Sequence, residues 1–339
     1  MRFAVLHHLE SAEGEPAAAV YADVTEQVQA AEALGYEIAW VAEHHFSPAK
    51  GRAPSPLLFL MHTAGQTRRI RLGTAVLPSP FYHALRLAEN VALFDQLTGG
   101  RLECGISSSG VPDEMRVFGV AQEGKHERLR ESLLWLRRAW AGEPVSSSIG
   151  AVGGADGVRV VPEPLQDPAA MVWVAASTPG AARVAGELGY HLLLPSLKTV
   201  ETSAEHVAIY QAELAERGHD AATRKLQQTL HLILDEDHDR AMRRAEPVIR
   251  AYYERYTKSG AVQRLANESL PAIMHRINFA AGGPEAVAEQ IAGVSAALGL
   301  THVAFQARLI GQTHREILRT HELAMSHVAP LLESTVAAG

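Results

Sequence analysis

The 339-residue chain lacks several features that mark particular classes of protein. Its lone cysteine, Cys104, excludes an intrachain disulfide framework and any CxxC metal site. The formal net charge is -7 and no block of Lys or Arg forms a basic tail, which argues against a general nucleic-acid binder. No run approaches the roughly 18 apolar residues of a membrane span, and the first residues do not resemble a cleavable signal peptide. We therefore expect a cytoplasmic protein.

The composition, with 47% apolar and 20% charged residues, is that of a soluble globular protein. Short apolar runs typical of strands alternate with stretches in which apolar residues recur every three or four positions, as in amphipathic helices. The expected strands are 2–6, 37–42, 70–77, 101–107, 171–176, 191–195, 226–234 and 301–307. The expected helices are 21–34, 56–67, 85–97, 127–140, 179–188, 204–217, 238–257 and 284–298, with a last one near 314–332.

Eight strand–helix units predict a (β/α)8 TIM barrel, an α/β fold whose active site lies at the C-terminal ends of the strands. Several helices end in a glycine that leads into the next strand, as in "EALGYEIAW" and "AALGLTHVAF". A doubly wound sheet is the alternative, but no GxGxxG follows the first strand. We predict a single domain over 1–339 with insertions at about 142–170 and 255–283. The second precedes the eighth helix and is a candidate lid on the catalytic side.

The run "WVAEHHFS" at 40–47 ends the second expected strand. Along an extended strand, Glu43 and His45 would share one side and His44 would face the other. A metal site needs ligands that converge on one face, which adjacent histidines do not provide, and "LHHL" at 6–9 has the same arrangement. We therefore expect no metal. The run is either an acid–base site or a pair of hydrogen-bonded histidines at a strand end.

Two other strand ends carry polar residues. The fourth strand runs into "CGISSSGVPDE" at 104–114, which leaves room for a planar ligand or forms a flexible serine loop. After the fifth strand, Ser177 or Thr178 is placed as an N-cap before Pro179. The free N–H groups of that turn would hold a phosphate, or the turn is simply capped. Arg128 would reach the same phosphate or belong to an exposed basic helix face.

Together these motifs resemble the bacterial luciferase family of flavin-dependent monooxygenases. The resemblance runs in order through "GYEIAWVAEHHF" (35–46), "LGTAVLP" (72–78), "HALRLAENVALFDQLTGGR" (83–101), "MRVFG" (115–119) and "VWVAAST" (172–178). It implies a barrel that binds reduced flavin mononucleotide (FMN) at its C-terminal mouth. It also implies that O2 reacts through a flavin C4a-peroxide to oxygenate a small, partly apolar aldehyde, ketone or aromatic compound. A deazaflavin-dependent oxidoreductase of the same fold and a non-catalytic flavin-binding protein are the alternatives.

The resemblance also implies site residues and partners. His44, His45 and Ser107 are the expected catalytic group. Contacts with the flavin are expected from Ala75 and Val76, which match a non-proline cis peptide, and from Ser107, Glu114, Arg128, Ala176, Ser177 and Thr178. Side chains available for a substrate pocket are Phe46, Phe59, Phe81 and Trp173. We further expect a separate flavin reductase that supplies reduced FMN, a homodimer, and no nucleic-acid or membrane partner.

Overall fold

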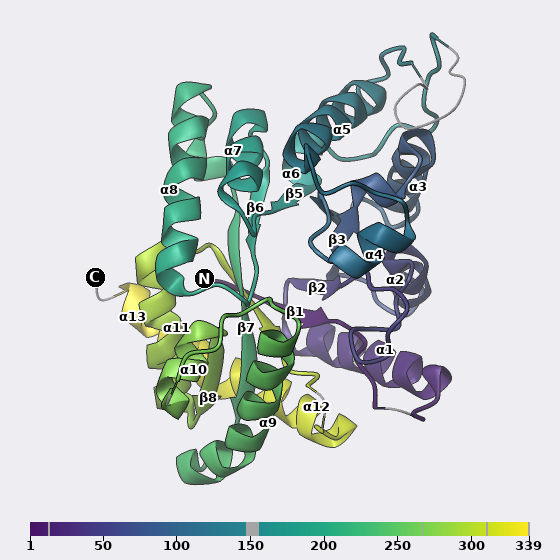
Figure 1. The fold of residues 1–339 in the computed structure, drawn as a ribbon. Helices are drawn as coiled ribbons and strands as arrows, with labels where there is room; N and C mark the ends of the chain where they lie inside the picture. Colours follow the sequence, from purple (N-terminus) through teal and green to yellow (C-terminus); the bar gives the residue numbers. More distant parts are fainter. Residues whose placement is uncertain (13, 147–155, 267, 310, 338–339) are drawn as a thin grey trace.

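The computed structural model describes residues 1–12, 14–146, 156–266, 268–309 and 311–337. Its centre is a closed barrel of eight parallel strands (Figure 1). They are β1 (Arg2–His7), β2 (Ile38–Val41), β3 (Arg71–Pro78), β4 (Leu102–Ser107), β5 (Val172–Ala175), β6 (His191–Leu194), β7 (Leu226–Leu234) and β9 (His302–Gln306). Neighbours pair in sequence order from β1 to β7, and β9 joins β7 to β1. The predicted (β/α)8 barrel is confirmed.

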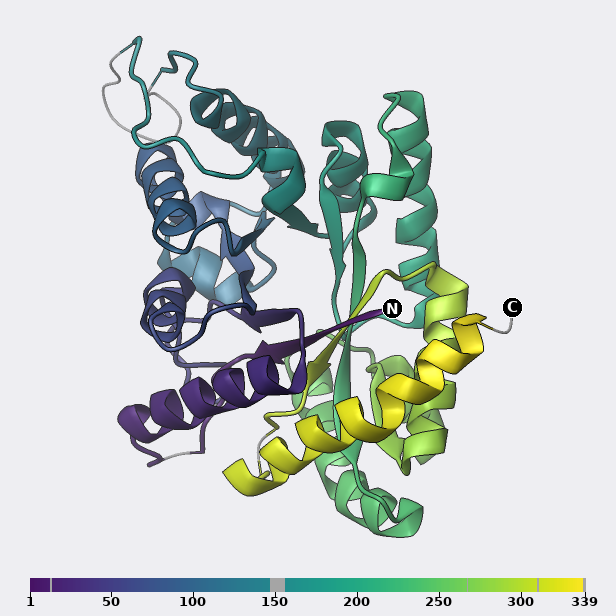
Figure 2. The ribbon, with the colours of Figure 1, turned by 180° about the vertical axis from the view of Figure 1, so that it is seen from behind.

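Helices surround the strands (Figures 1 and 2) because each amphipathic helix buries its apolar face on the sheet. Gly35 and Gly299, with φ of 90° and 65°, end two of them as left-handed caps, as the sequence predicts. None of the described helices is long and apolar enough to cross a membrane. The main helices are α1 (Ala17–Leu34), α2 (Pro56–Ala64), α3 (Ala84–Leu97), α5 (Lys125–Trp140), α7 (Pro179–Leu188), α8 (Val200–Glu216), α9 (His238–Lys258), α11 (Pro284–Leu298), α12 (His314–Leu323) and α13 (Ala329–Ala337).

The structure adds short elements that the sequence patterns did not predict. They are the helices α4 (Pro112–Val117), α6 (Pro168–Met171) and α10 (Leu270–Arg276), the 3-10 helices η1 (Ser79–Phe81) and η2 (Ala221–Thr223), and the strand β8 (Phe279–Gly282). The last helix, predicted near 314–332, contains the π-helical segment η3 (Ala324–Val328) between α12 and α13. β8 pairs with the C-terminal half of β7, from His231 to Leu234. The predicted insertion 255–283 therefore contains regular structure. In the other insertion, residues 147–155 lie outside the described residues.

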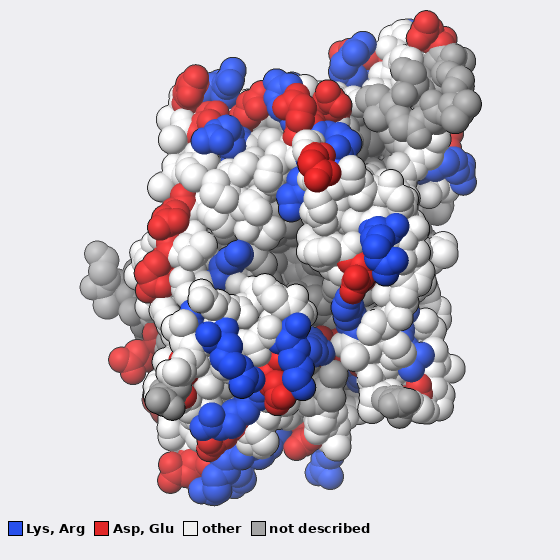
Figure 3. All heavy atoms as spheres, in the orientation of Figure 1, with Lys and Arg blue, Asp and Glu red and all other residues white. Residues whose placement is uncertain are grey.

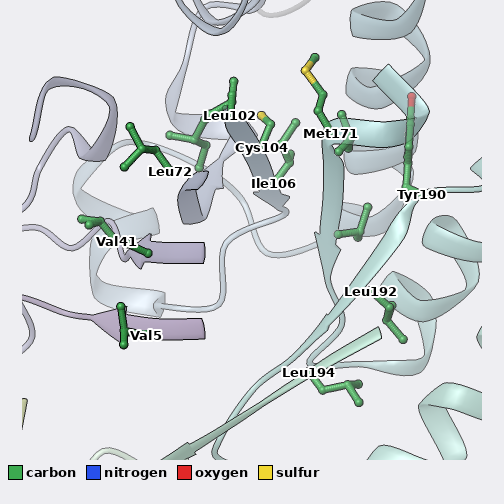
Figure 4. Packing of buried hydrophobic residues seen from close by; sticks show 14 of the residues in the cluster. Val5, Val41, Leu72, Leu102, Cys104, Ile106, Met171, Tyr190, Leu192 and Leu194 are labelled. Atoms are coloured by element: carbon green, nitrogen blue, oxygen red, sulfur yellow. The ribbon is translucent and has the colours of Figure 1, made fainter. Parts of the chain in front are cut away.

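The barrel strands alternate between two apolar layers. One layer faces the surrounding helices, and Figure 4 shows part of it, with Val5, Val41 and Leu192 on three different strands. The other layer fills the inside of the barrel. Its upper members Ala75, Val76 and Ala175 are only half-buried, so the interior ends in an accessible apolar floor. The fully packed members of this inner layer are Ala4, Leu6, Ile38, Trp40, Trp173, Leu193 and Ala304.

Candidate active site

The C-terminal ends of the first four strands bring most of the predicted residues to one rim of the barrel. β2 ends at Val41, and the residues that follow leave the extended conformation at Phe46, whose φ is 61°. The short helix α4 follows β4 and turns Glu114 toward the end of β2. On this side the surface is hollowed between the part that carries α4 and the part that carries α8 and α10 (Figures 1 and 3).

His44 lies between a glutamate and a second histidine. Its Nδ1 is 3.4 Å from Oε1 of Glu114, and its Nε2 is 3.1 Å from Nδ1 of His8. The N–H of His45 donates to the same Glu114 oxygen over 3.1 Å. Burial favours a protonated Glu114, but hydrogen bonds from His44 and from the N–H of His45 outweigh it, so the pKa of Glu114 is lowered. Glu114 is therefore a carboxylate at neutral pH.

His45 has a glutamate of its own. Its Nε2 is 3.0 Å from Oε1 of Glu43, and the hydroxyl of Tyr82 donates to Oε2 of the same side chain. The Glu43 side chain is only 1% exposed, and burial raises its pKa to about 8 despite the hydrogen bond from Tyr82. Burial also lowers the pKa of His45. At neutral pH this pair is therefore uncharged, with the Glu43 carboxyl protonated.

Three phenylalanines form an apolar wall beside His45. The rings of Phe81 and Phe118 stack with centroids 4.4 Å apart, and Phe118 meets the His45 ring at 4.8 Å. Phe46 lies 5.7 Å from Phe118 and is 67% exposed. The structure thus places the predicted pocket residues Phe46 and Phe81 at the mouth. Phe118 was missed, and its place in the "MRVFG" segment was the signal available in the sequence.

The floor of the mouth is shaped by β3 and β4. The peptide bond between Ala75 and Val76 is cis, as the resemblance implies, and the register with β4 shifts between Thr74 and Leu77. A side chain on Gly105 would meet the Thr74 carbonyl oxygen at 2.0 Å, so only glycine fits there. Ser107, at the end of β4, is half-buried and its hydroxyl accepts the N–H of Ser109.

The first turn of α7 carries the predicted phosphate segment. Thr178 caps it by accepting the N–H of Ala181, and Ser177 beside it is exposed. Nε2 of His126, at the start of α5, lies 2.8 Å from the Thr178 hydroxyl. His126 was missed because it is 52 residues away in sequence. Ala176 is fully buried, and its carbonyl oxygen lies 3.2 Å from Nδ1 of His206.

Arg128 is directed away from this turn. Its guanidinium donates to the carbonyl oxygens of Ala121 and Glu123, at 2.5 and 2.6 Å. It therefore holds the loop before its own helix and lines a cavity of about 600 Å³ between η1, α3 and α5. The prediction that Arg128 reaches the α7 turn does not fit these contacts, because both terminal nitrogens of its guanidinium bind carbonyl groups of the loop before α5.

Two predicted pocket residues lie elsewhere. Phe59 is on α2 in the outer apolar layer, where its ring packs 6.0 Å from that of Tyr21. Trp173 is completely buried inside the barrel, where its Nε1 donates to Glu103 over 2.5 Å. Lys225, which immediately precedes β7, lies 3.0 Å from the same carboxylate, so this contact is at the N-terminal end of the barrel. Neither side chain lines the mouth.

The segment 255–283 is attached on both sides of the mouth. Arg255, near the end of α9, lies 2.8 Å from Glu10, which follows β1, and donates to the carbonyl oxygen of Ala49, which follows β2. On the opposite side, His275 of α10 lies 3.0 Å from Glu201 at the start of α8. The segment therefore borders the mouth where a lid would be, and its closure stays a prediction.

The order of these features along the chain matches a known family model. The model for the luciferase-like monooxygenases matches residues 1–302. The chain belongs to this family. The luciferase-like fold is also that of the monooxygenase RslO1 of Streptomyces bottropensis, with 24% identity, a TM-score of 0.84, and coverage of 97% of this chain and 99% of that one.

Two curated relatives cover most of this luciferase-like chain. It is 26% identical over 283 residues to the oxygenase component of the flavin-dependent trigonelline monooxygenase of Acinetobacter baylyi, which covers 80% of this chain and 78% of the relative. It is 28% identical over 318 residues to the F420-dependent glucose-6-phosphate dehydrogenase of Amycolatopsis mediterranei, with 87% and 93% covered. Of two more similar relatives, however, the chain spans only 54% and 30% of the length.

Proposed function

We propose that the protein is the oxygenase component of a two-component, reduced-FMN-dependent monooxygenase. Bound reduced FMN would supply the two electrons with which O2 places one oxygen atom on an organic substrate and releases the other as water. The observation that carries this proposal is the meeting of Glu114, His44 and His45 at the barrel mouth, beside the apolar floor of Ala75 and Val76. A flavin-dependent relative of the same family supports the choice of cofactor.

The residues present fit a flavin mononucleotide. The half-buried side chains of Ala75, Val76 and Ala175 offer an apolar surface for a planar ring system. The exposed Ser177 and the N-terminus of α7, a helix of 10 residues, offer hydroxyl and N–H groups for a phosphate. His126, in contact with Thr178, lies beside this turn, and burial lowers its pKa, so it is a neutral polar group there. We assign these residues and Ser107 to the cofactor, and we leave Arg128 out.

The residues of the rim divide the remaining work. His44, oriented by the Glu114 carboxylate, would take part in the proton transfers of the reaction. His45 would support the wall formed by Phe46, Phe81 and Phe118, against which a partly apolar substrate would pack. The bordering segment 255–283 would exclude water from the loaded site.

The proposal is tested by binding and by isotope labelling. The pure protein is titrated anaerobically with reduced FMN, and then given 18O2 and a panel of apolar aldehydes, ketones and phenols. We expect binding of reduced FMN and one 18O atom in a product. Tight binding of reduced FMN without labelled product from any class would favour the non-catalytic flavin-binding alternative.

A second candidate is a deazaflavin-dependent oxidoreductase, which the similarity to the F420-dependent dehydrogenase favours. Parallel titrations with reduced FMN and with reduced F420 separate the two. Preference for F420, together with substrate oxidation in the absence of oxygen, would overturn the monooxygenase proposal.

We also propose a separate reductase and a homodimer. The sequence has no GxGxxG after its first strand, so another protein would reduce the flavin. Leu58 of α2 and Leu93 and Leu97 of α3 are exposed leucines on two helices that contact each other. Light scattering tests the dimer: we expect twice the mass of 36.6 kDa, and a monomeric Leu97→Asp variant. A monomeric wild-type protein would contradict it.

A further inference from the structure

We propose that His8 is the outer member of a proton relay, Glu114–His44–His8, and that protons enter and leave this relay at Nε2 of His8. The inference rests on the proposed function, because it names a further residue for proton transfer at the same site. His8 belongs to the "LHHL" run, which the sequence pattern placed at the end of the first strand without giving it a role.

The direction of the relay follows from the hydrogen bonds of His44. Glu114 is a carboxylate and has no proton to give, so Nδ1 of His44, 3.4 Å away, must carry the hydrogen. Neutral His44 then has its lone pair on Nε2 and accepts the Nδ1–H of His8 over 3.1 Å. The remaining lone pair of the relay is then on Nε2 of His8, because the one hydrogen bond that His8 makes with the described residues is through its Nδ1.

This assignment changes which imidazole meets the reactants. Both ring nitrogens of His44 are occupied, one by Glu114 and one by His8, and the two imidazole rings are nearly parallel, 19° apart. In this arrangement His44 has no free nitrogen with which to accept a proton from a substrate. His8 is half-buried in the mouth and presents one.

The proton moves in two steps, first to His8 and then from His8 to His44. A proton from the reacting group forms a new Nε2–H bond on His8. The Nδ1–H bond of His8 then breaks and that proton bonds to Nε2 of His44, so the positive charge rests on His44 beside the Glu114 carboxylate. The reverse sequence returns the proton to the reactants. Charge is thus held where a carboxylate stabilises it.

The surroundings of His8 oppose a charge that stays on His8 itself. Burial lowers the pKa of His8, and the neighbouring His44, His231 of β7, Arg255 of α9 and His7 lower it further. Among the described residues, the hydrogen bond to His44 is the contact through which an added proton can leave His8. A histidine that cannot keep a proton but adjoins one that can is suited to passing it on.

Two substitutions of His8 distinguish a role in proton transfer from a role in orienting His44. In His8→Asn the side-chain amide can still donate to Nε2 of His44, but it cannot accept a proton. We expect kcat with reduced FMN and O2 to fall by about 100-fold, with the Kd for reduced FMN and the substrate KM changed by less than about threefold. In His8→Ala, added imidazole should restore part of the lost rate. The matched control is His327→Asn, an exposed histidine on η3, which should leave kcat unchanged.

A readout on the protein alone keeps this inference separate from the proposed function. Long-range 15N–1H spectra of histidine-labelled protein, without flavin, give the tautomer of each ring. We expect the proton on Nδ1 in both His44 and His8 of the wild type, and Nδ1 of His44 still protonated in His8→Asn. A proton on Nε2 of His44, or a His8→Asn variant with wild-type kcat, would overturn the relay. These tautomers in a protein that does not use reduced FMN would overturn the proposed function alone.

Discussion

His44 and His45 are consecutive residues, each beside a glutamate, yet the two pairs differ in charge. The Glu114 carboxylate accepts hydrogen bonds from His44 and from the N–H of His45, and its pKa is lowered. Glu43 is also buried, but burial raises its pKa to about 8 despite the hydrogen bond from Tyr82, and its partners Tyr82 and His45 are uncharged. The Glu114–His44 pair is therefore suited to take up and release a proton. The Glu43–His45 pair is uncharged and supports the site through hydrogen bonds.

The difference shows that neighbours rather than the motif decide what each histidine does. Both histidines come from the same short run after the end of β2, but their side chains contact different neighbours. His44 meets Glu114 and His8 on the open side of the mouth, with its side chain 18% exposed. His45 meets Glu43 and the phenylalanine wall. The predictions below test this division of roles, from the largest expected effect to the smallest.

Removal of each imidazole should have unequal effects. We expect His44→Ala to lower kcat by about 10³-fold, because general acid–base transfer contributes 10²–10⁴-fold. His45→Ala should lower it by about tenfold, through loss of the aromatic contacts that shape the wall. Steady-state kinetics with reduced FMN and the substrate found in the labelling screen provide the measurement. Equal losses in the two variants would remove the distinction between the pairs.

Replacement of each glutamate by glutamine should have unequal effects on kcat. Glu114→Gln removes the carboxylate that stabilises a cationic His44, and we expect kcat to fall by about 100-fold. Glu43→Gln replaces a protonated carboxyl with a neutral amide of the same shape, and kcat should stay within about threefold of wild type. A large loss in Glu43→Gln, with folding intact by circular dichroism, would show that Glu43 works as a carboxylate.

Stability should depend on pH through Glu43. Its folded-state pKa of about 8 is above the ordinary 4.5, so the folded protein keeps a proton that the unfolded chain loses in this window. The contribution of Glu43 to stability is therefore fully present below pH 4.5 and falls as pH rises, by up to about 1.4 kcal/mol per pH unit, until about pH 8. Glu43→Gln should lose this contribution to the slope. Urea unfolding at pH 6.5 and 8 measures it, with Glu89→Gln, an exposed carboxylate on α3, as the control.

The smallest effect is expected at Tyr82. Tyr82→Phe removes the hydroxyl that donates to Glu43 and leaves a buried acceptor without that donor. We expect a loss of about 1 kcal/mol in the free energy of unfolding and little change in kcat. Urea unfolding at pH 6.5 measures the loss. A variant as stable as wild type would indicate that Glu43 is satisfied by His45 alone.

Much of the fold could be predicted because the barrel strands are short, mostly apolar runs and the main helices have a regular apolar face. β8 was missed because "FAAG" is a run of four buried residues, three of them small, with no alternating pattern. The residues after β2 also lack a regular apolar pattern. Spacing in the sequence therefore could not assign Glu114 and Tyr82 to the site of the two histidines. Those contacts depend on α4 and η1, which are short turns formed by tertiary packing.

The wrong predictions for Trp173 and Phe59 have a common cause. Trp173 and Phe59 are large aromatic residues, and sequence alone does not tell which face of a strand or helix meets the mouth and which meets the core. Arg128 was placed on the correct helix, but its guanidinium binds nearby carbonyl groups. By contrast, the Ala75–Val76 cis peptide was implied by the family resemblance and is present in the structure.

The central claim is that Glu114 is ionised and Glu43 is protonated in the same folded protein at neutral pH. Titration of the glutamate side-chain carbons by 13C NMR tests it directly, with the resonances assigned through Glu114→Gln and Glu43→Gln. We predict that Glu114 stays ionised from pH 5 to pH 8 and that Glu43 ionises only near pH 8. Two carboxylates that are both ionised at pH 6.5 would contradict the account.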